Sequence, residues 1–212
     1  MPRRLESRRF DRSYYQRFYA GPDRVHGARD IAHLASGVVG IATWLGVEVR
    51  SVLDVGAGTG LWGRWFRRHR PRARVRSIES SEYACRAYGH EHRDIAAWCA
   101  RETFDLVVFH SVLQYLDDAQ AARAIVHVGR MCRGLMYLEA VAREDGPLLD
   151  LGRTDTAIHV RPAAWYRARL SRHFVQVGAG LWASRRARIP LYALEATAPD
   201  ASGPRRAVRR HR

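Results

Sequence analysis

The sequence contains no lysine. All 36 basic residues are arginine, and with 21 acidic residues they give a net charge of +15. A charge of this size would suit binding to nucleic acid, an anionic substrate or a membrane surface. However, the replacement of every lysine indicates a compositional bias of the whole chain, as a GC-rich gene would give. Charge alone therefore does not identify a nucleic-acid-binding face, which would need arginines clustered on one surface.

Cysteines and long apolar runs are also scarce. Cys85, Cys99 and Cys132 have neither metal-ligand nor redox spacing, and their number is odd, so we expect reduced thiols in a cytoplasmic protein. The longest apolar run, residues 37–45, is too short to span a bilayer, and the polar start of the chain lacks the apolar segment of a signal peptide. The 212 residues suit one domain with a sizeable core, and no internal repeat is present.

What the sequence does contain is an alternation of short apolar runs with helical stretches. Apolar residues at helical spacing predict two N-terminal helices, 10–20 and 30–45. Beyond residue 50 the patterns predict strand 52–55, helix 61–69, strand 75–78, helix 82–88, strand 106–109, helix 119–131 and strand 135–138. Alternation of this kind predicts an α/β fold, with a mostly parallel sheet covered by helices on both faces.

The end of the chain departs from this alternation. We expect a helix that begins near Pro162 and two late strands, 174–177 and 191–194, whose hairpin-like separation predicts an antiparallel edge. The chain then divides into a helical cover over residues 1–45, an α/β domain over 46–197 and a flexible basic tail over 198–212, where little apolar content is left to bury.

The most informative segment follows the first strand of the alternation and reads Val52-Leu53-Asp54-Val55-Gly56-Ala57-Gly58-Thr59-Gly60. Its glycines allow a tight turn and the close approach of a ligand, and the next helix directs its N-terminal amides toward that ligand. A dinucleotide-binding loop would place its third glycine where Leu61 stands. A phosphate-binding loop would need a lysine, which the chain lacks.

The pattern Asp-x-Gly-x-Gly-x-Gly after a strand instead resembles motif I of the class I methyltransferases, which are Rossmann-like and use S-adenosylmethionine (SAM). The likeness extends over residues 50 to about 140. It implies a SAM cofactor held by the motif residues Asp54, Gly56, Ala57, Gly58 and Gly60. The family also has an acidic residue after the second strand for the ribose and another after the third strand for the adenine. The resemblance implies these roles for Glu79 and Asp94, with the backbone N–H of Ile95 as a second adenine contact.

The segment from Phe104 to Leu116 resembles the family's motif IV region, which lies at the carboxyl end of a central strand. The resemblance implies that His110 and Tyr115 contact the cofactor or take part in catalysis. The motif Asn/Asp-Pro-Pro-Tyr is absent from this region, which argues against the amino-methylating DNA and protein-glutamine enzymes. Candidates for a general base are His110, His26, His33 and Tyr115, and no metal is predicted, because no His/Asp/Glu spacing suggests one.

Aromatic residues gather in the first predicted helix, at Tyr14, Tyr15, Phe18 and Tyr19, and in a later one, at Trp165 and Tyr166. Both groups have two interpretations, as lining of an acceptor pocket or as ordinary packing. The chain most resembles compact bacterial enzymes that methylate small molecules, with methylation at O, N or C left open. The alternatives are an RNA methyltransferase, favoured only by the charge, and a SAM-binding protein without turnover. The sequence does not predict the oligomeric state.

Overall fold

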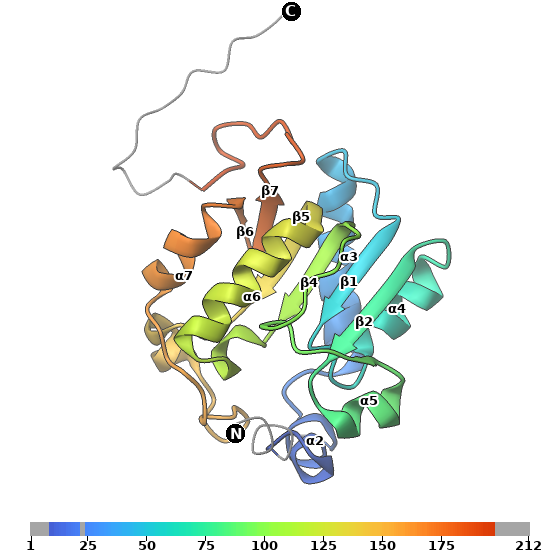
Figure 1. Ribbon diagram of the computed structural model, residues 1–212, viewed down its shortest axis with the longest axis vertical. Helices are drawn as coiled ribbons and strands as arrows, with labels where there is room; N and C mark the ends of the chain where they lie inside the picture. Colours follow the sequence, from blue (N-terminus) through green and yellow to red (C-terminus); the bar gives the residue numbers. More distant parts are fainter. Residues whose placement is uncertain (1–8, 22–23, 198–212) are drawn as a thin grey trace, which may run out of the picture.

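The computed structural model describes residues 9–21 and 24–197. Its centre is a seven-stranded sheet with helices on both faces (Figure 1). Across the sheet, the strands are β3 (Glu91–His92), β2 (Arg74–Glu79), β1 (Ser51–Val55), β4 (Phe104–His110), β5 (Cys132–Glu139), β7 (Leu181–Ser184) and β6 (Phe174–Gly178). From β3 to β5 all neighbouring strands are parallel, whereas β7 is antiparallel to both β5 and β6. The predicted Rossmann-like fold with an antiparallel edge near the C-terminus is therefore confirmed.

The position of the last strand was predicted wrongly. The partner of β6 is Leu181–Ser184, and residues 191–194 form no strand. The turn between β6 and β7 is short, and Gly178 and Gly180 there have φ angles of 111° and 77°, which glycine adopts without strain. Because the chain reverses at once, β7 enters the sheet directly and all four of its residues are buried. Leu194, in contrast, is fully exposed in a later turn.

Helices cover both faces of the sheet. On each face, the helices and the strands together form one apolar cluster. Helices α3 (Ala28–Trp44) and α4 (Leu61–His69) pack on one face, whereas α6 (Asp118–Met131) and α7 (Ala163–Leu170) pack on the other. The alternation of side chains along each strand explains the division, since Val52 belongs to the first cluster and Leu53 to the second. The remaining helical elements are α2 (Arg12–Tyr19), α5 (Glu82–Tyr88) and the short turns η1 (Leu113–Tyr115) and η2 (Arg143–Leu148).

The strand order places a ligand-binding position between β1 and β4. From β1 the chain proceeds outward to β2 and β3, then returns to β4 on the other side of β1. The loops after β1 and β4 therefore diverge, and a crevice opens at the carboxyl ends of these central strands.

The two N-terminal helices differ in their relation to this crevice. Helix α3 belongs to the core, where Ile31, Ala35 and Val38 pack in the same cluster as the first residues of β1. Helix α2 lies below the carboxyl ends of the strands in the view of Figure 1, where it can cover the crevice. The predicted basic tail, residues 198–212, lies outside the described residues. Within the described residues, no helix is both long and apolar enough to cross a membrane.

Candidate functional site

The glycine loop joins β1 to α4 through backbone conformations that favour glycine. Gly56, Gly58 and Gly60 have φ angles of 66°, 54° and 74°, in the left-handed region where other residues are strained. A side chain at Gly56 would also collide with Val112, because an added Cβ would lie 2.4 Å from its Cγ2 atom. At Gly58 nothing lies within 3.8 Å of an added Cβ, so this glycine borders open space.

Two side chains hold the loop at Gly58. The Gly58 N–H donates to Glu79 Oε2 over 2.9 Å, and the Gly58 carbonyl oxygen accepts from His90 Nε2 over 3.0 Å. Burial lowers the pKa of His90, so its ring is neutral and must carry its proton on Nε2 to make this bond. Glu79 is only 6% exposed and also accepts from the backbone N–H groups of Ser80 and Ser81. The Ser80 hydroxyl group also donates to Oε1, so Glu79 organises the loop and keeps one lone pair, on Oε2, for a ligand.

Asp54 lies buried at the end of β1, with an exposed fraction of 2%. Its Oδ2 atom has no hydrogen-bond partner among the described residues. Burial, and secondarily the nearby charge of Glu79, raises the pKa of Asp54 to about 7. A perturbed, unpartnered carboxyl group at the base of a glycine loop is a feature of functional sites, because a stable core would exclude it.

A cavity of about 700 Å³ lies at the carboxyl ends of β1, β2 and β4, a volume typical of small-molecule sites. Seven of the predicted site residues line it: Gly56, Gly58, Glu79, Asp94, Ile95, His110 and Tyr115. The other three are not among its lining residues. Asp54 is buried at the strand end, while the N–H groups of Ala57 and Gly60 donate to Ile78 O and Ala57 O, where they shape the turn.

The adenine contacts implied by the sequence lie together on this wall. Asp94 accepts from the Ala96 N–H through Oδ1 over 2.8 Å, which fixes the carboxylate at the cavity edge. The Ile95 N–H makes no hydrogen bond within the described part of the chain, and the Ile95 side chain is 5% exposed. An acceptor and a donor thus stand side by side at this edge of the cavity.

Helix α2 contributes aromatic side chains to the same cavity. Tyr14, Tyr15 and Tyr19 line it, whereas Phe18 is buried but is not among the lining residues. The hydroxyl groups of Tyr14 and Tyr115 lie 3.0 Å apart and share a hydrogen bond. Burial raises the pKa of Tyr115, so it acts as a neutral hydroxyl group and is a poor candidate for a general base.

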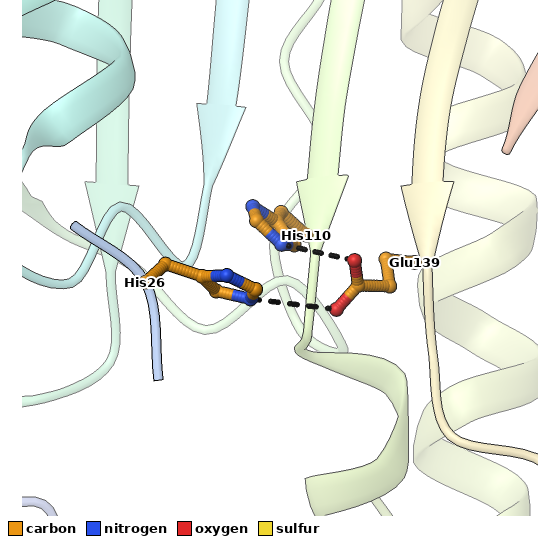
Figure 2. A group of neighbouring side chains, drawn as sticks. All are labelled: His26, His110 and Glu139. Carbon is orange, nitrogen blue, oxygen red and sulfur yellow. Dashed lines mark ion pairs between the residues drawn. The ribbon is translucent and has the colours of Figure 1, made fainter. Parts of the chain in front are cut away.

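Beside the cavity, the structure brings together His26, His110 and Glu139, which are widely separated in the sequence (Figure 2). Glu139 Oε2 lies 3.3 Å from His110 Nε2, in a contact that is not aligned as a hydrogen bond, and Oε1 lies 3.8 Å from His26 Nε2. Ser111, held at a φ angle of 56°, donates its hydroxyl group to Oε1 over 2.8 Å. Burial by itself would raise the pKa of Glu139, but the contacts with the two histidines and Ser111 outweigh it, so the pKa lies well below its ordinary value.

Trp62, in the first turn of α4, approaches His110 from the other side. Its indole N–H donates to His110 Nδ1 over 3.1 Å. Because indole nitrogen is only a donor, His110 Nδ1 must be an acceptor and carry no proton. The glycine loop, which leads into α4, is thereby connected to the group at the end of β4.

The other candidates from the sequence lie elsewhere. His33 is on the exposed side of α3. Trp165 and Tyr166 do not line the cavity, and they pack around the buried guanidinium group of Arg161.

Sequence reasoning missed His90, Trp62 and Glu139. A signal for Glu139 was present, because this carboxylate directly follows the predicted apolar strand 135–138. The sheet register pairs Glu139 directly with His110 at the end of β4. Nothing in the sequence pointed to the Trp62 contact, which depends on the rotation of α4 about its axis.

The comparison with protein families decides the classification. The model of the family described as "Methyltransferase domain" matches residues 25–187, most of the chain. The chain belongs to this family. The residues that match the methyltransferase family begin after α2 and include α3 and all the strands of the sheet up to β7. No curated protein matches the chain.

Solved methyltransferase structures share the fold at low sequence identity. An O-methyltransferase family protein from Burkholderia thailandensis is 16% identical with a TM-score of 0.53, and the match covers 76% of this chain and 59% of that one. The chain thus spans about three fifths of that protein's length. Magnesium protoporphyrin IX methyltransferase from Synechocystis PCC 6803, solved with bound SAM, is 14% identical with a TM-score of 0.56, and the match covers 86% and 96% of the two chains. A sugar N-methyltransferase from Streptoalloteichus sp. ATCC 53650 is 18% identical with a TM-score of 0.59 and coverages of 80% and 99%.

Proposed function

We propose that this methyltransferase binds SAM in the cavity and transfers its methyl group to a small-molecule acceptor. The cavity carries this proposal, because its size, its glycine loop and its partly apolar wall suit an adenosyl ligand. The residues fit this cofactor. Gly58 borders the space that a ligand would fill, Asp54 Oδ2 lacks a partner in the described structure, and the Ile95 N–H is free to donate there.

Each residue then has a proposed role toward the cofactor. Gly56 and Gly58 admit it against the backbone, and Glu79 Oε2 accepts from a ribose hydroxyl group with the lone pair that the Gly58 N–H leaves free. Asp94 and Ile95 contact the adenine. Asp54 contributes from the strand end, behind the loop, where its unpartnered Oδ2 atom can accept a hydrogen bond.

When bound, SAM supplies a methyl group that its sulfonium already activates. The chain therefore has to orient the acceptor, exclude water and accept a proton where the acceptor carries one. Tyr14, Tyr15 and Tyr19 cover the cavity and reduce its exposure to water. His110 and Tyr115 stand at the end of β4 as polar groups within this aromatic wall, and we propose that they contact the acceptor or the cofactor.

Small molecules suit this site better than RNA. An RNA-binding rim would present free arginines beside the cavity mouth. The arginines that line the cavity are Arg9 and Arg93. Arg9 pairs with Asp155 and stacks on Phe10 and Tyr115, so its charge is already engaged. The solved relatives described above include enzymes named for a porphyrin and a sugar, which also favours a small-molecule acceptor. A cytoplasmic location is likewise a proposal, supported by the free state of all three thiols.

Calorimetry with SAM tests the cofactor assignment. We expect micromolar affinity, on the order of −8 kcal/mol. Gly58→Val should abolish binding, because its side chain would enter the open space beside the loop. Gly46→Val is the matched control, since Gly46 has a φ angle of 76° with nothing near an added Cβ and lies away from the cavity. Glu79→Ala should weaken SAM binding by about 1.5–3 kcal/mol. Binding of NAD without binding of SAM would refute the proposal.

The acceptor class is then tested with labelled SAM. Purified protein should transfer the labelled methyl group to a component of a metabolite pool and not to RNA or protein pools. Transfer to RNA at physiological salt would replace the small-molecule proposal, whereas SAM binding without any transfer would favour the non-catalytic alternative.

A further inference from the structure

The hydrogen bond from Trp62 determines where His110 carries its proton. Since Nδ1 accepts from the indole, the neutral ring must have its hydrogen on Nε2, the atom that faces Glu139. Nδ1 then uses its lone pair to accept from the indole, and Nε2 carries the proton. His110 in this form has no free lone pair with which to take a proton from a substrate.

The same bond disfavours a metal ion between the three side chains, although their ligand atoms lie within 4.8 Å of one another. A histidine binds a metal through a nitrogen without a proton, and its other nitrogen then donates, usually to a carboxylate or carbonyl group. Metal binding by His110 Nε2 would place a proton on Nδ1, where it would face the indole N–H over 3.1 Å. Two donors would oppose each other, so the arrangement suits a proton-handling group better than a metal centre.

His26 has the lone pair that His110 lacks. Its Nε2 faces Glu139 Oε1, and its Nδ1 makes no hydrogen bond within the described part of the chain. The His26 side chain is 31% exposed, against 10% for His110, so an acceptor molecule can reach it. His26 is not itself a lining residue of the cavity, but its ring lies 4.8 Å between centroids from the ring of His110, which is one (Figure 2).

We propose that His26 is the general base of the methyl transfer, that Glu139 positions it, and that the acceptor is a group with a removable proton, such as a hydroxyl or a protonated amine. This inference rests on the proposed function. The new bond forms between the acceptor atom and the methyl carbon while the carbon–sulfur bond breaks, and its electron pair stays on sulfur. The acceptor proton moves to His26 Nδ1 and leaves later to water.

Glu139 serves this step in two ways. Its Oε1 atom lies 3.8 Å from His26 Nε2, beyond hydrogen-bond distance, and its negative charge there favours the tautomer with the proton on Nε2, which leaves Nδ1 as the acceptor. Its negative charge also stabilises the imidazolium form of His26 once the proton arrives. Ser111 donates to Oε1 and the Tyr137 hydroxyl group donates to Oε2, so Glu139 keeps its orientation while His26 changes charge.

The first test needs no acceptor and no bound cofactor. Nitrogen-15 NMR of the histidine rings, assigned with His26→Gln and His110→Gln, distinguishes which ring nitrogen carries the proton. We expect His110 in the Nε2–H form in the full chain, and a loss of this preference in Trp62→Phe. His110 in the Nδ1–H form would overturn the proposal, because its Nε2 atom would then be free to act as a base or a ligand.

The second test uses the acceptor found with labelled SAM. His26→Ala should lower kcat by about 10²–10⁴-fold, the usual contribution of a general base, and leave SAM affinity by calorimetry unchanged. Added imidazole should restore part of this activity, and the rise of kcat with pH on the acidic side should disappear. Glu139→Gln should reduce kcat less and also change the pH profile. His33→Ala, which removes an exposed histidine from α3, is the control and should behave like wild type.

The outcomes distinguish a failure of the proposed function from a failure of His26 as its general base. Loss of SAM binding in the wild-type protein would refute the proposed function itself. Normal SAM binding with full activity in His26→Ala would refute only the base. Titration with Zn²⁺ and Mn²⁺ provides a third arm, in which we expect no tight binding. Stoichiometric binding that is lost in both His26→Ala and Glu139→Gln would overturn the proposal in favour of a metal centre.

Discussion

At the scale of single residues, Asp54 shows that a buried carboxyl group in a candidate site lowers the stability of the folded protein. A carboxyl group that is buried without a full set of partners favours its neutral form, which is the reason for its raised pKa. In the unfolded chain the same group has its ordinary pKa near 3.8. The folded state therefore binds an extra proton between these two values, and its stability falls as the pH rises from about 4 to about 7.

We predict that Asp54→Asn is more stable than wild type at pH 8, by about 1–3 kcal/mol, because the substitution removes a buried charge. The difference should vanish below pH 4, where the wild-type carboxyl group is protonated in both states. Chemical denaturation at both pH values measures the effect, and SAM affinity should fall in the same variant.

Asp105→Asn is the matched control for this prediction. Asp105 accepts from Ser51 and Arg133, and these bonds hold its pKa below the ordinary value despite burial. Its replacement should destabilise the protein at pH 8. An Asp54→Asn protein that is less stable than wild type at pH 8 would show that the carboxylate has a partner in the folded state.

At the scale of elements, the buried Arg161, which lies just before α7, connects its segment by hydrogen bonds to the turn after β4. Its guanidinium group donates to Asp118 Oδ1 over 2.6 Å and to the carbonyl oxygens of Leu113 and Leu116. Arg161 is only 3% exposed, and each nitrogen of its guanidinium group donates to a partner. The turn η1, which carries Tyr115 to the cavity, is thus held from a part of the chain about 45 residues away.

We predict that Arg161→Ala lowers the free energy of unfolding by about 2–4 kcal/mol, because it removes the buried side chain together with its hydrogen bonds to Leu113, Leu116 and Asp118. Thermal or urea denaturation measures this loss. Arg172→Ala, which removes an exposed arginine nearby, should change stability by less than about 0.5 kcal/mol. Equal stability of the two variants would contradict the role given to Arg161.

The elements that could be predicted from sequence are those with a strong periodic pattern. Helices 61–69 and 82–88 were predicted with their observed bounds, and the central strands were found within a few residues. The two-residue strand β3 is too short to have a pattern. The late strand was misplaced because Leu191–Leu194 and Leu181–Ser184 have similar apolar content, and only the tight turn at Gly178–Gly180 decides between them.

The candidate site was predictable to the extent that it follows a strand end. Glu79 and His110 line the cavity and directly follow the predicted strands 75–78 and 106–109, whereas Asp94, which also lines it, was indicated only by the family resemblance. His26 was one of several possible bases, and sequence gave no reason to prefer it. Its selection depends on Glu139 and Trp62, which reach the site through the sheet register and the rotation of a helix.

At the scale of the whole molecule, part of the large positive charge is neutralised by ion pairs within the fold. Arg76 of β2 pairs with Glu91 of β3 and with Glu102 in the loop before β4, and Arg133 pairs with Asp105 at the opposite end of the sheet from the cavity. Such pairs contribute little stability when they are exposed, but they leave fewer arginines free to form one binding surface.

We predict that the basic tail is dispensable for SAM binding. It contains Arg205, Arg206, Arg209, Arg210 and Arg212. Truncation after Ala198 should leave SAM affinity unchanged and should weaken retention of RNA on filters at low salt, because phosphate contacts release counterions. RNA binding by the full chain should disappear at physiological salt. A loss of SAM affinity on truncation would mean that the tail contributes to the cofactor site.

The contact between Trp62 and His110 also gives the protein an optical reporter. An indole beside an imidazole loses fluorescence when the imidazole becomes cationic, since the charged ring accepts an excited electron more readily. Trp62 begins the helix that follows the glycine loop, and its ring N–H touches the histidine at the end of β4. Its emission, isolated by comparison with Trp62→Phe, should therefore register both the arrival of a cofactor at the loop and a change of charge among the histidines, without any added dye.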